Sequence, residues 1–190
     1  MEQMKIGVIT TTQIDSTTIT KLLENLSTIF PDTATKQLET KLIIPEEAYD
    51  KRRMQYRSDI VLKEIGIESA KDKTLDRILG IVNIDIFRPP LNFVFGEAEC
   101  PGKTALISLY RLKPEFHKRK PDEDLLLERT TKEAVHELGH TFGLQHCPNP
   151  FCVMYFSNSI FETDRKQSLF CNKCTTNLRN LTSEPRRRTD

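Results

Sequence analysis

The chain has 190 residues and a formal net charge of +1, with 28 lysine and arginine residues against 27 aspartate and glutamate residues. A chain of this length builds one well-packed domain with room for a small appendage. The near-neutral charge argues against nucleic acid as a main partner, because no global positive field attracts a polyanion. No apolar run approaches the roughly 20 residues of a membrane-spanning helix. The N-terminus lacks the pattern of a signal peptide, so we expect a cytoplasmic protein that does not enter a membrane.

The first two-thirds of the chain alternates between strand-like and helix-like segments. Apolar and β-branched residues predict strands at residues 5–10 and 40–44. Between these strands, Asp15 and Ser16 can cap an amphipathic helix that extends through Leu26.

A second helix and three more strands are predicted next. The helix is expected to begin after Pro45 and to end near Gly66, with four residues facing inward: Met54, Ile60, Val61 and Ile65. The apolar run at residues 79–87 predicts a buried strand, and residues 92–96 and 104–110 predict two more. This alternation indicates an α+β fold whose N-terminal half is similar to α/β proteins.

The strongest helix signal lies at residues 122–142. The helix opens with Asp122 and further acidic residues, which suit the positive end of the helix dipole. Its apolar residues repeat at helical spacing: Leu127, Ala134, Val135, Leu138 and Phe142. Gly143 ends it, because glycine readily adopts the left-handed conformation that reverses the chain. Periodicity is poor from Leu144 onward, so we expect an irregular C-terminal segment.

Histidine and cysteine are rare in this chain, and most of them lie in one stretch. Three of the four histidines and four of the five cysteines lie between residues 136 and 174, and the first 99 residues contain neither. In a reducing compartment, such clustering indicates a metal before it indicates disulfides. Cys100 lies outside the cluster and is expected to be a small, buried, apolar residue.

His136 and His140 lie four residues apart on the predicted helix, so they project from one face and can bind one metal ion. The turn at Gly143 can bring His146 to a third ligand position and leave a fourth position open. Three histidines with an open position are typical of a catalytic zinc site. The short pattern also occurs in proteins without zinc, where both helical histidines are ordinary residues.

Glu137 follows the first histidine and can reach a water molecule at the open position. Zinc lowers the pKa of such a water to about 7. Glu137 is then expected to act as general base, taking a proton from the water and returning it to the leaving amine. This chemistry predicts hydrolysis of a peptide bond and equally permits hydrolysis of a non-peptide amide.

Four cysteines form a second candidate metal site. Cys147 and Cys152 are followed by Cys171 and Cys174, and two closely spaced pairs of thiolates fit a closed tetrahedral zinc site. The backbone amides of the C-x-x-C turn can donate to the sulfurs. A closed site is expected to hold the C-terminal segment together. Two disulfides or four free thiols are the alternatives.

These histidines and cysteines, together with Met154, resemble the archaemetzincins, a family of metzincin zinc metallopeptidases. Residues 91–99, 105–116 and 156–164 extend the resemblance over more than half of the chain. Two features differ from the family pattern. Pro90 stands where a glycine is expected, and the segment after Met154 is about one residue short before the next cysteine. Both differences concern the shape of the cleft and leave every expected ligand in place.

The resemblance implies a metzincin-like zincin fold with a twisted mixed sheet, backing helices and an active-site helix beneath a cleft. Met154 is then a hydrophobic base under the histidines, and an edge strand within 92–99 or 104–110 pairs with extended substrate. Two subdomains are implied: residues 1–143 with the sheet and active-site helix, and residues 144–190 with the Met-turn and a structural zinc.

The predicted function is a zinc metallopeptidase with two zinc ions per chain, one catalytic and one structural. We expect a peptide or protein as substrate and a monomeric chain. The alternative is a non-catalytic zinc module that binds protein or nucleic acid through the cysteines and the basic residues 186–188. The sequence leaves open which peptide is cleaved, and whether cleavage is internal or terminal.

Overall fold

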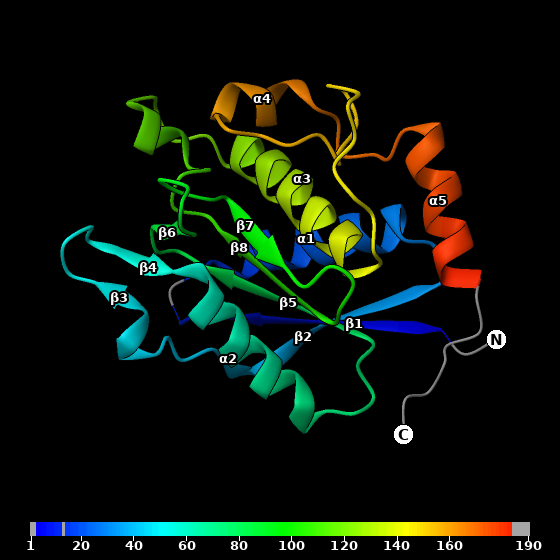
Figure 1. Ribbon diagram of the computed structural model, residues 1–190, viewed down its shortest axis with the longest axis horizontal. Coiled ribbons are helices and arrows are strands. Elements are labelled where there is room, and N and C mark those ends of the chain that lie inside the picture. The colour runs from blue at the N-terminus through cyan, green and yellow to red at the C-terminus, as the bar shows by residue number, and fades with distance from the viewer. Residues whose placement is uncertain (1–2, 13, 184–190) are drawn as a thin grey trace.

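The computed structural model describes residues 3–12 and 14–183. Five strands form the main sheet: β1 (Met4–Thr10), β2 (Thr33–Lys41), β5 (Arg77–Val82), β7 (Gly96–Ala98) and β8 (Thr104–Ser108). Their order is β2-β1-β5-β8-β7. Neighbouring strands pair in parallel except at the edge, where β7 runs antiparallel to β8. The strands fan across one another, so the mixed sheet is twisted (Figure 1).

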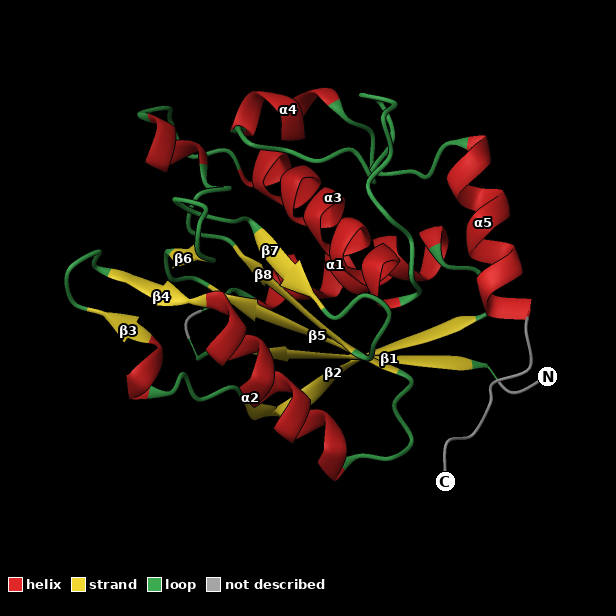
Figure 2. Ribbon diagram, viewed as in Figure 1, coloured by secondary structure: helices red, strands yellow, loops and turns green. Residues whose placement is uncertain are grey.

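Helices cover both faces of this sheet (Figure 2). α1 (Ser16–Ile29) and α3 (Glu123–Thr141) lie on one face, and α2 (Ser58–Lys71) lies on the other. Successive strand residues point to opposite layers. Ile81 therefore packs in the core with α1 and α3, whereas Val82 packs in the core with α2. Helix α3 lies between the sheet and the C-terminal segment, and most of its second half is buried.

The predicted start of the second helix is wrong. Residues 46–57 form a short 3₁₀ turn, η1 (Glu46–Ala48), and the strands β3 (Tyr49–Asp50) and β4 (Gln55–Arg57). Met54 lies in the turn between these strands with φ +55°, and it is 74% exposed rather than inward-facing. Helix α2 begins only at Ser58 and continues through Gly66. Met54 matched the helical spacing of the later apolar residues by coincidence.

Three predicted strands are displaced along the chain. The strand expected at 40–44 is β2, which ends at Lys41; it is an edge strand of mostly solvated polar residues, so it gives no apolar signal. The run at 79–87 divides between β5 and β6 (Ile86–Phe87), which joins β3 and β4 in a small second sheet. The strand expected at 92–96 is β7, which begins at Gly96.

The strongest predictions are confirmed. Strand β1 covers residues 5–10, and β8 covers most of 104–110. Asp15 caps α1, where its carboxylate accepts from the backbone N–H of Thr18. Asp122 caps α3 in the same way, and Gly143 follows that helix with φ +98°.

The C-terminal segment contains two helices that the sequence analysis missed, α4 (Ile160–Arg165) and α5 (Asn172–Ser183), joined by irregular chain. The basic residues 186–188 lie outside the described residues. The division into subdomains after Gly143 stays a prediction. A further short 3₁₀ turn, η2 (Pro114–His117), precedes α3. Within residues 3–12 and 14–183, no helix is long and apolar enough to cross a membrane.

Candidate active site

Helix α3 and the turn after it bring together the three predicted histidines. The Nε2 atoms of His136 and His140 lie 3.1 Å apart, as expected for one helical turn. Because Gly143 reverses the chain, the ring of His146 lies 4.8 Å from that of His140 and 5.3 Å from that of His136. One ring nitrogen from each histidine lies within 4.8 Å of the others. Together the three residues could hold one metal ion.

The hydrogen bonds at the Nδ1 atoms of His136 and His140 indicate that the Nε2 atoms of these rings can bind a cation. His136 Nδ1 lies 2.7 Å from the Val153 carbonyl oxygen, and His140 Nδ1 lies 2.7 Å from the Leu144 carbonyl oxygen. A carbonyl only accepts, so each Nδ1 carries a hydrogen and each neutral ring keeps a lone pair on Nε2. Two lone pairs then face each other across 3.1 Å. A tetrahedral zinc ion with Zn–N bonds of 2.0–2.1 Å holds its nitrogens about 3.3 Å apart, which matches this spacing.

The electrostatic surroundings favour neutral histidines. Burial lowers the pKa of His136 well below its usual value, with a further effect from the charge of Lys166. Burial also lowers the pKa of His140, and burial together with His140 lowers the pKa of His146 to about 4. Neutral imidazole is the form that binds a metal.

Glu137 lines a cleft of about 490 Å³ together with the three histidines, the edge strand β7, and residues 156–158. Its side chain packs directly against the backbone of Gly96. Burial raises the pKa of Glu137 well above its usual value, and the nearby carboxylate of Glu133 adds to this effect. The cleft thus holds a carboxylate beside a group of metal-binding nitrogens.

Met154 is fully buried and packs against α3 at Gly139, the residue before His140. A Cβ atom at Gly139 would lie 2.5 Å from the sulfur of Met154, so the absence of a side chain permits this contact. The preceding carbonyl, that of Val153, orients His136. The loop around Met154 therefore supports the histidines by packing and by a hydrogen bond.

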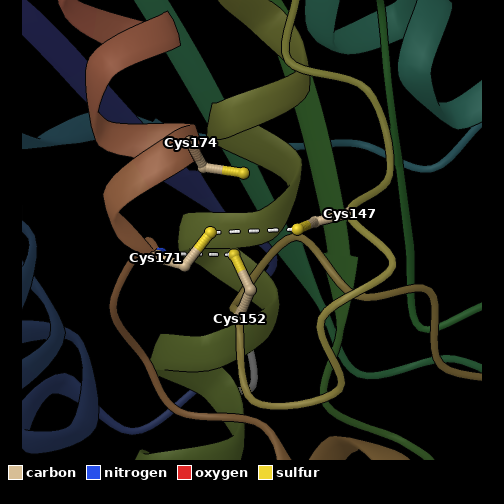
Figure 3. Close-up of side chains that lie close together, drawn as sticks. All are labelled: Cys147, Cys152, Cys171 and Cys174. Carbon is tan, nitrogen blue, oxygen red and sulfur yellow. Dashed lines mark hydrogen bonds between the residues drawn. The ribbon is translucent and has the colours of Figure 1, made fainter.

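The four predicted cysteines also come together, between the loop after α3 and the start of α5 (Figure 3). Their sulfurs lie within 4.8 Å of one another, with 3.8 Å between Cys147 Sγ and Cys171 Sγ, and all four thiols are free. The backbone N–H of Cys171 donates to Cys152 Sγ at 3.4 Å. Burial acts to raise the pKa of Cys171, but hydrogen bonds from the Cys174 backbone and neighbouring thiols outweigh it and bring the pKa to about 7. This group could hold a second metal ion.

The expectation for Cys100 is wrong. The residue is exposed rather than buried, and it lines the cleft near the histidines. Its thiol donates to the Leu144 carbonyl at 3.6 Å and accepts from Gln145 Nε2 at 3.2 Å. The turn that follows β7 carries the residue out to the surface, away from the core where a small apolar side chain would pack.

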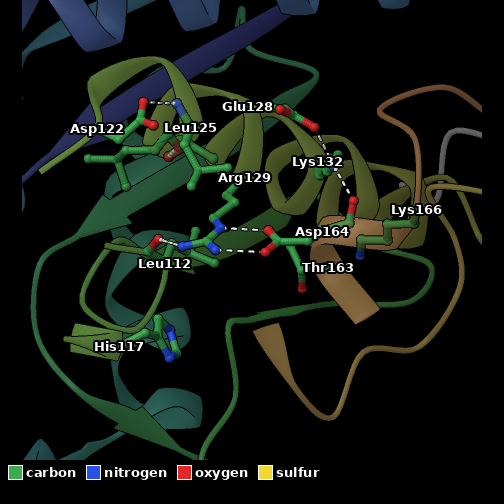
Figure 4. Close-up of polar contacts among 12 residues, drawn as sticks. Leu112, His117, Asp122, Leu125, Glu128, Arg129, Lys132, Thr163, Asp164 and Lys166 are labelled. Carbon is green, nitrogen blue, oxygen red and sulfur yellow. Dashed lines mark hydrogen bonds and ion pairs between the residues drawn. The ribbon is translucent and has the colours of Figure 1, made fainter. Parts of the chain in front are cut away.

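Buried charges that join α3 to α4 were not found by sequence analysis (Figure 4). Arg129, 1% exposed, forms two hydrogen bonds of 2.7 Å with Asp164 and donates to the Leu112 carbonyl at 2.8 Å. One turn later, Glu133 forms an ion pair of 3.0 Å with Lys166. The available signal was helical spacing, because Glu133 follows Arg129 by four residues and His136 follows Glu133 by three, which places all three on one face of the helix.

Three histidines at an open cleft and a closed group of four thiols are the ligand sets typical of catalytic and structural zinc sites, respectively. The family model described as "Peptidase family M54" matches residues 1–180. The chain belongs to this family of zinc metallopeptidases.

Individual relatives agree with this assignment. An archaemetzincin from Pyrococcus abyssi is 50% identical over 138 residues, which cover 72% of this chain and 73% of that protein. The crystal structure of archaemetzincin from Methanopyrus kandleri matches with a TM-score of 0.85 at 38% identity, covering 96% of this chain and 97% of that chain. A structure described as a zinc-dependent peptidase from Methanocorpusculum labreanum matches with a TM-score of 0.83 at 30% identity, covering 91% and 99%. The family resemblance and the fold class are confirmed.

Proposed function

We propose that this protein is a metzincin-type peptidase that binds two zinc ions and hydrolyses peptide bonds in the cleft beside β7. His136, His140 and His146 are the proposed ligands of the catalytic zinc, and the four cysteines are the proposed ligands of the structural zinc. The observation that carries the proposal is the pair of Nε2 lone pairs facing each other at 3.1 Å with Glu137 in the same cleft. That arrangement suits a bound cation, and a buried carboxylate beside it suits proton transfer.

Bound zinc supplies a Lewis acid that polarises the scissile carbonyl and makes water acidic enough to lose a proton near neutral pH. Glu137 is the general base: its carboxylate takes this proton and then delivers it to the leaving amine. Burial raises the pKa of Glu137, which strengthens the carboxylate as a base toward the water. The Nδ1 hydrogen bonds of His136 and His140 keep both rings oriented during the reaction.

Strand β7 supplies a place for the substrate backbone. It forms the edge of the main sheet, so one side of its backbone is free of strand partners. An extended peptide can add to such an edge as a further strand, with main-chain hydrogen bonds giving affinity. Glu137 lines the same cleft beside β7, so a peptide bound at this edge would lie next to the proposed general base.

Glu137→Gln tests the proposal, because glutamine keeps the shape of the side chain and cannot act as a base. We expect the variant to retain two zinc ions by elemental analysis and to lose hydrolysis of a peptide library by at least about 100-fold. Glu128→Gln is the matched control, since Glu128 lies on the same helix and its side chain is 57% exposed. Wild-type rates in the Glu137 variant contradict the mechanism. A wild-type protein that holds two zinc ions and cleaves no peptide supports the non-catalytic zinc module instead.

A further inference from the structure

Gly96, the first residue of the edge strand, lies in direct contact with Glu137. A Cβ atom on Gly96 would lie 2.6 Å from Glu137 Cγ, 2.7 Å from Glu137 Oε1 and 2.6 Å from the backbone oxygen of Leu106 on β8. The end of the Glu137 side chain can move more easily than the backbone of the paired strand, so Glu137 yields first. Non-bonded carbon atoms pack at about 3.5–4.0 Å, so no side chain fits between them. The side chain of Glu137 therefore packs directly against the backbone of β7 at Gly96.

The hydrogen bonds between β7 and β8 define which backbone groups of β7 face outward. Ser108 N–H donates to the Phe95 carbonyl at 2.8 Å, and Glu99 N–H donates to the Thr104 carbonyl at 3.0 Å. In an antiparallel pair, residues that bond to the partner alternate with residues that do not. Residues 95, 97 and 99 thus bond to β8, and Gly96 and Ala98 direct their N–H and C=O groups toward the free edge.

The opposite face of β7 holds the strand in place. The side chain of Glu97 forms an ion pair of 3.0 Å with Arg88. On the α3 side, Ala98 packs against the core that contains α3. Gly96 is thus fixed on both sides, with its α-carbon against Glu137 and its peptide groups at the free edge.

We propose that Gly96 is a positioning residue that sets the register between the general base and the bound peptide. Its missing side chain leaves room for the carboxylate of Glu137, and its outward N–H and C=O pair with the substrate residue that flanks the scissile bond. The proposal rests on the proposed peptidase function and adds to it the point of the edge strand that aligns the substrate.

Gly96→Ala is the first test. The added methyl group displaces Glu137, and a displacement on the order of 1 Å costs about 100-fold in rate. We expect kcat to fall by about that factor and by more than KM rises, with two zinc ions retained. Gly80→Ala is the matched control: its Cβ would lie 2.2 Å from Ile65 Cδ1 in the core on the other face of the sheet. It should lower the melting temperature without lowering kcat.

A second test uses the wild-type sequence at position 96, in case Gly96→Ala does not fold. A cleavable peptide is N-methylated at one amide at a time, and binding to the Glu137→Ala variant is measured by fluorescence anisotropy. We expect the largest loss, at least about fivefold, at an amide flanking the bond that the wild-type protein cleaves. A largest loss three or more residues away, or none, overturns the proposal, as does wild-type kcat in folded Gly96→Ala. Either result with an active wild-type protein leaves the peptidase function intact, whereas a wild-type protein that cleaves no peptide overturns both.

Discussion

The histidine group and the cysteine group are joined at His146 and Cys147, yet the fold surrounds them differently. His146 is exposed and lines the cleft, whereas Cys147 is buried and its N–H donates to the Met154 carbonyl at 2.9 Å. Three of the four cysteines are buried, so this group is closed. An open ligand set leaves room for a reacting molecule, and a closed set contributes mainly folding free energy. Under the proposed function, one short segment supplies ligands for both chemistry and stability, and mutations can separate the two roles.

Among the variants, His140→Ala is expected to have the largest effect on activity. Removing one of three histidine ligands should release the metal from the open site and reduce hydrolysis to background. Total zinc should fall from about two ions per chain to about one, as measured by elemental analysis, because the cysteines are untouched. Two retained ions, or an unchanged rate, would show that this histidine is not a ligand.

Cys174→Ser tests the cysteine group, and it should reduce stability rather than act first on activity. Serine is a poor zinc ligand, and loss of a structural zinc site should cost about 5 kcal/mol or more of unfolding free energy, measured by denaturant unfolding. Because Cys147 follows His146, we also expect weaker retention of the remaining zinc against a chelator. Cys100→Ser is the control, since Cys100 is an exposed thiol outside the group. Equal stability of the two variants would contradict a structural role.

A third prediction concerns the protein contacts that hold the C-terminal segment without metal. Arg129→Met removes the partner of Asp164 and of the Leu112 carbonyl, and should cost about 2–3 kcal/mol, because a buried guanidinium loses its hydrogen bonds to a charged group that is itself 30% exposed. Lys36→Met, which breaks the exposed pair between Lys36 and Asp72, should cost at most about 1 kcal/mol. Urea unfolding of both variants measures the difference. Similar values for the two would mean that α4 is held mainly by the zinc site.

The same contrast explains how much the sequence could reveal about the sites. All seven proposed ligands were found from residue type and local spacing, because two histidines share one helix, the third follows the turn at Gly143, and the cysteines come in close pairs. The pairing of Arg129 with Asp164 joins residues 35 positions apart, and no local pattern specifies such a partner. The contact between Gly96 and Glu137 depends on how closely β7 approaches α3, which is a property of tertiary packing.

The fold shows the same limit. Helix α3 was predicted almost to the residue, because Asp122 caps its start and Gly143 follows its end. Strand β2 was misplaced because an edge strand with one solvated side has little apolar character. Helix α5 was missed because only three of its twelve residues are apolar: Cys174, Leu178 and Leu181. Local signals therefore located the chemistry better than the elements that support it.

The smallest predicted effect concerns the packing of Met154 against α3 at Gly139. Alanine in a helix interior is ordinarily favoured over glycine by about 0.5–1 kcal/mol. At Gly139 the added methyl group would lie 2.5 Å from Met154 Sδ and 3.2 Å from Phe170 Cε1, so overpacking should outweigh this gain. We expect Gly139→Ala to cost about 1–2 kcal/mol, since the flexible methionine can retreat in part.

A double-mutant cycle with Met154→Ala identifies the cause. Met154→Ala alone should cost about 2–5 kcal/mol through the cavity that it leaves. The double variant should cost less than the sum of the single variants by about 1 kcal/mol, because the new methyl group enters that cavity. Additive costs would mean that the two residues do not press on each other. Two zinc ions retained in Met154→Ala would further show that Met154 supports the open site by packing and is not one of its ligands.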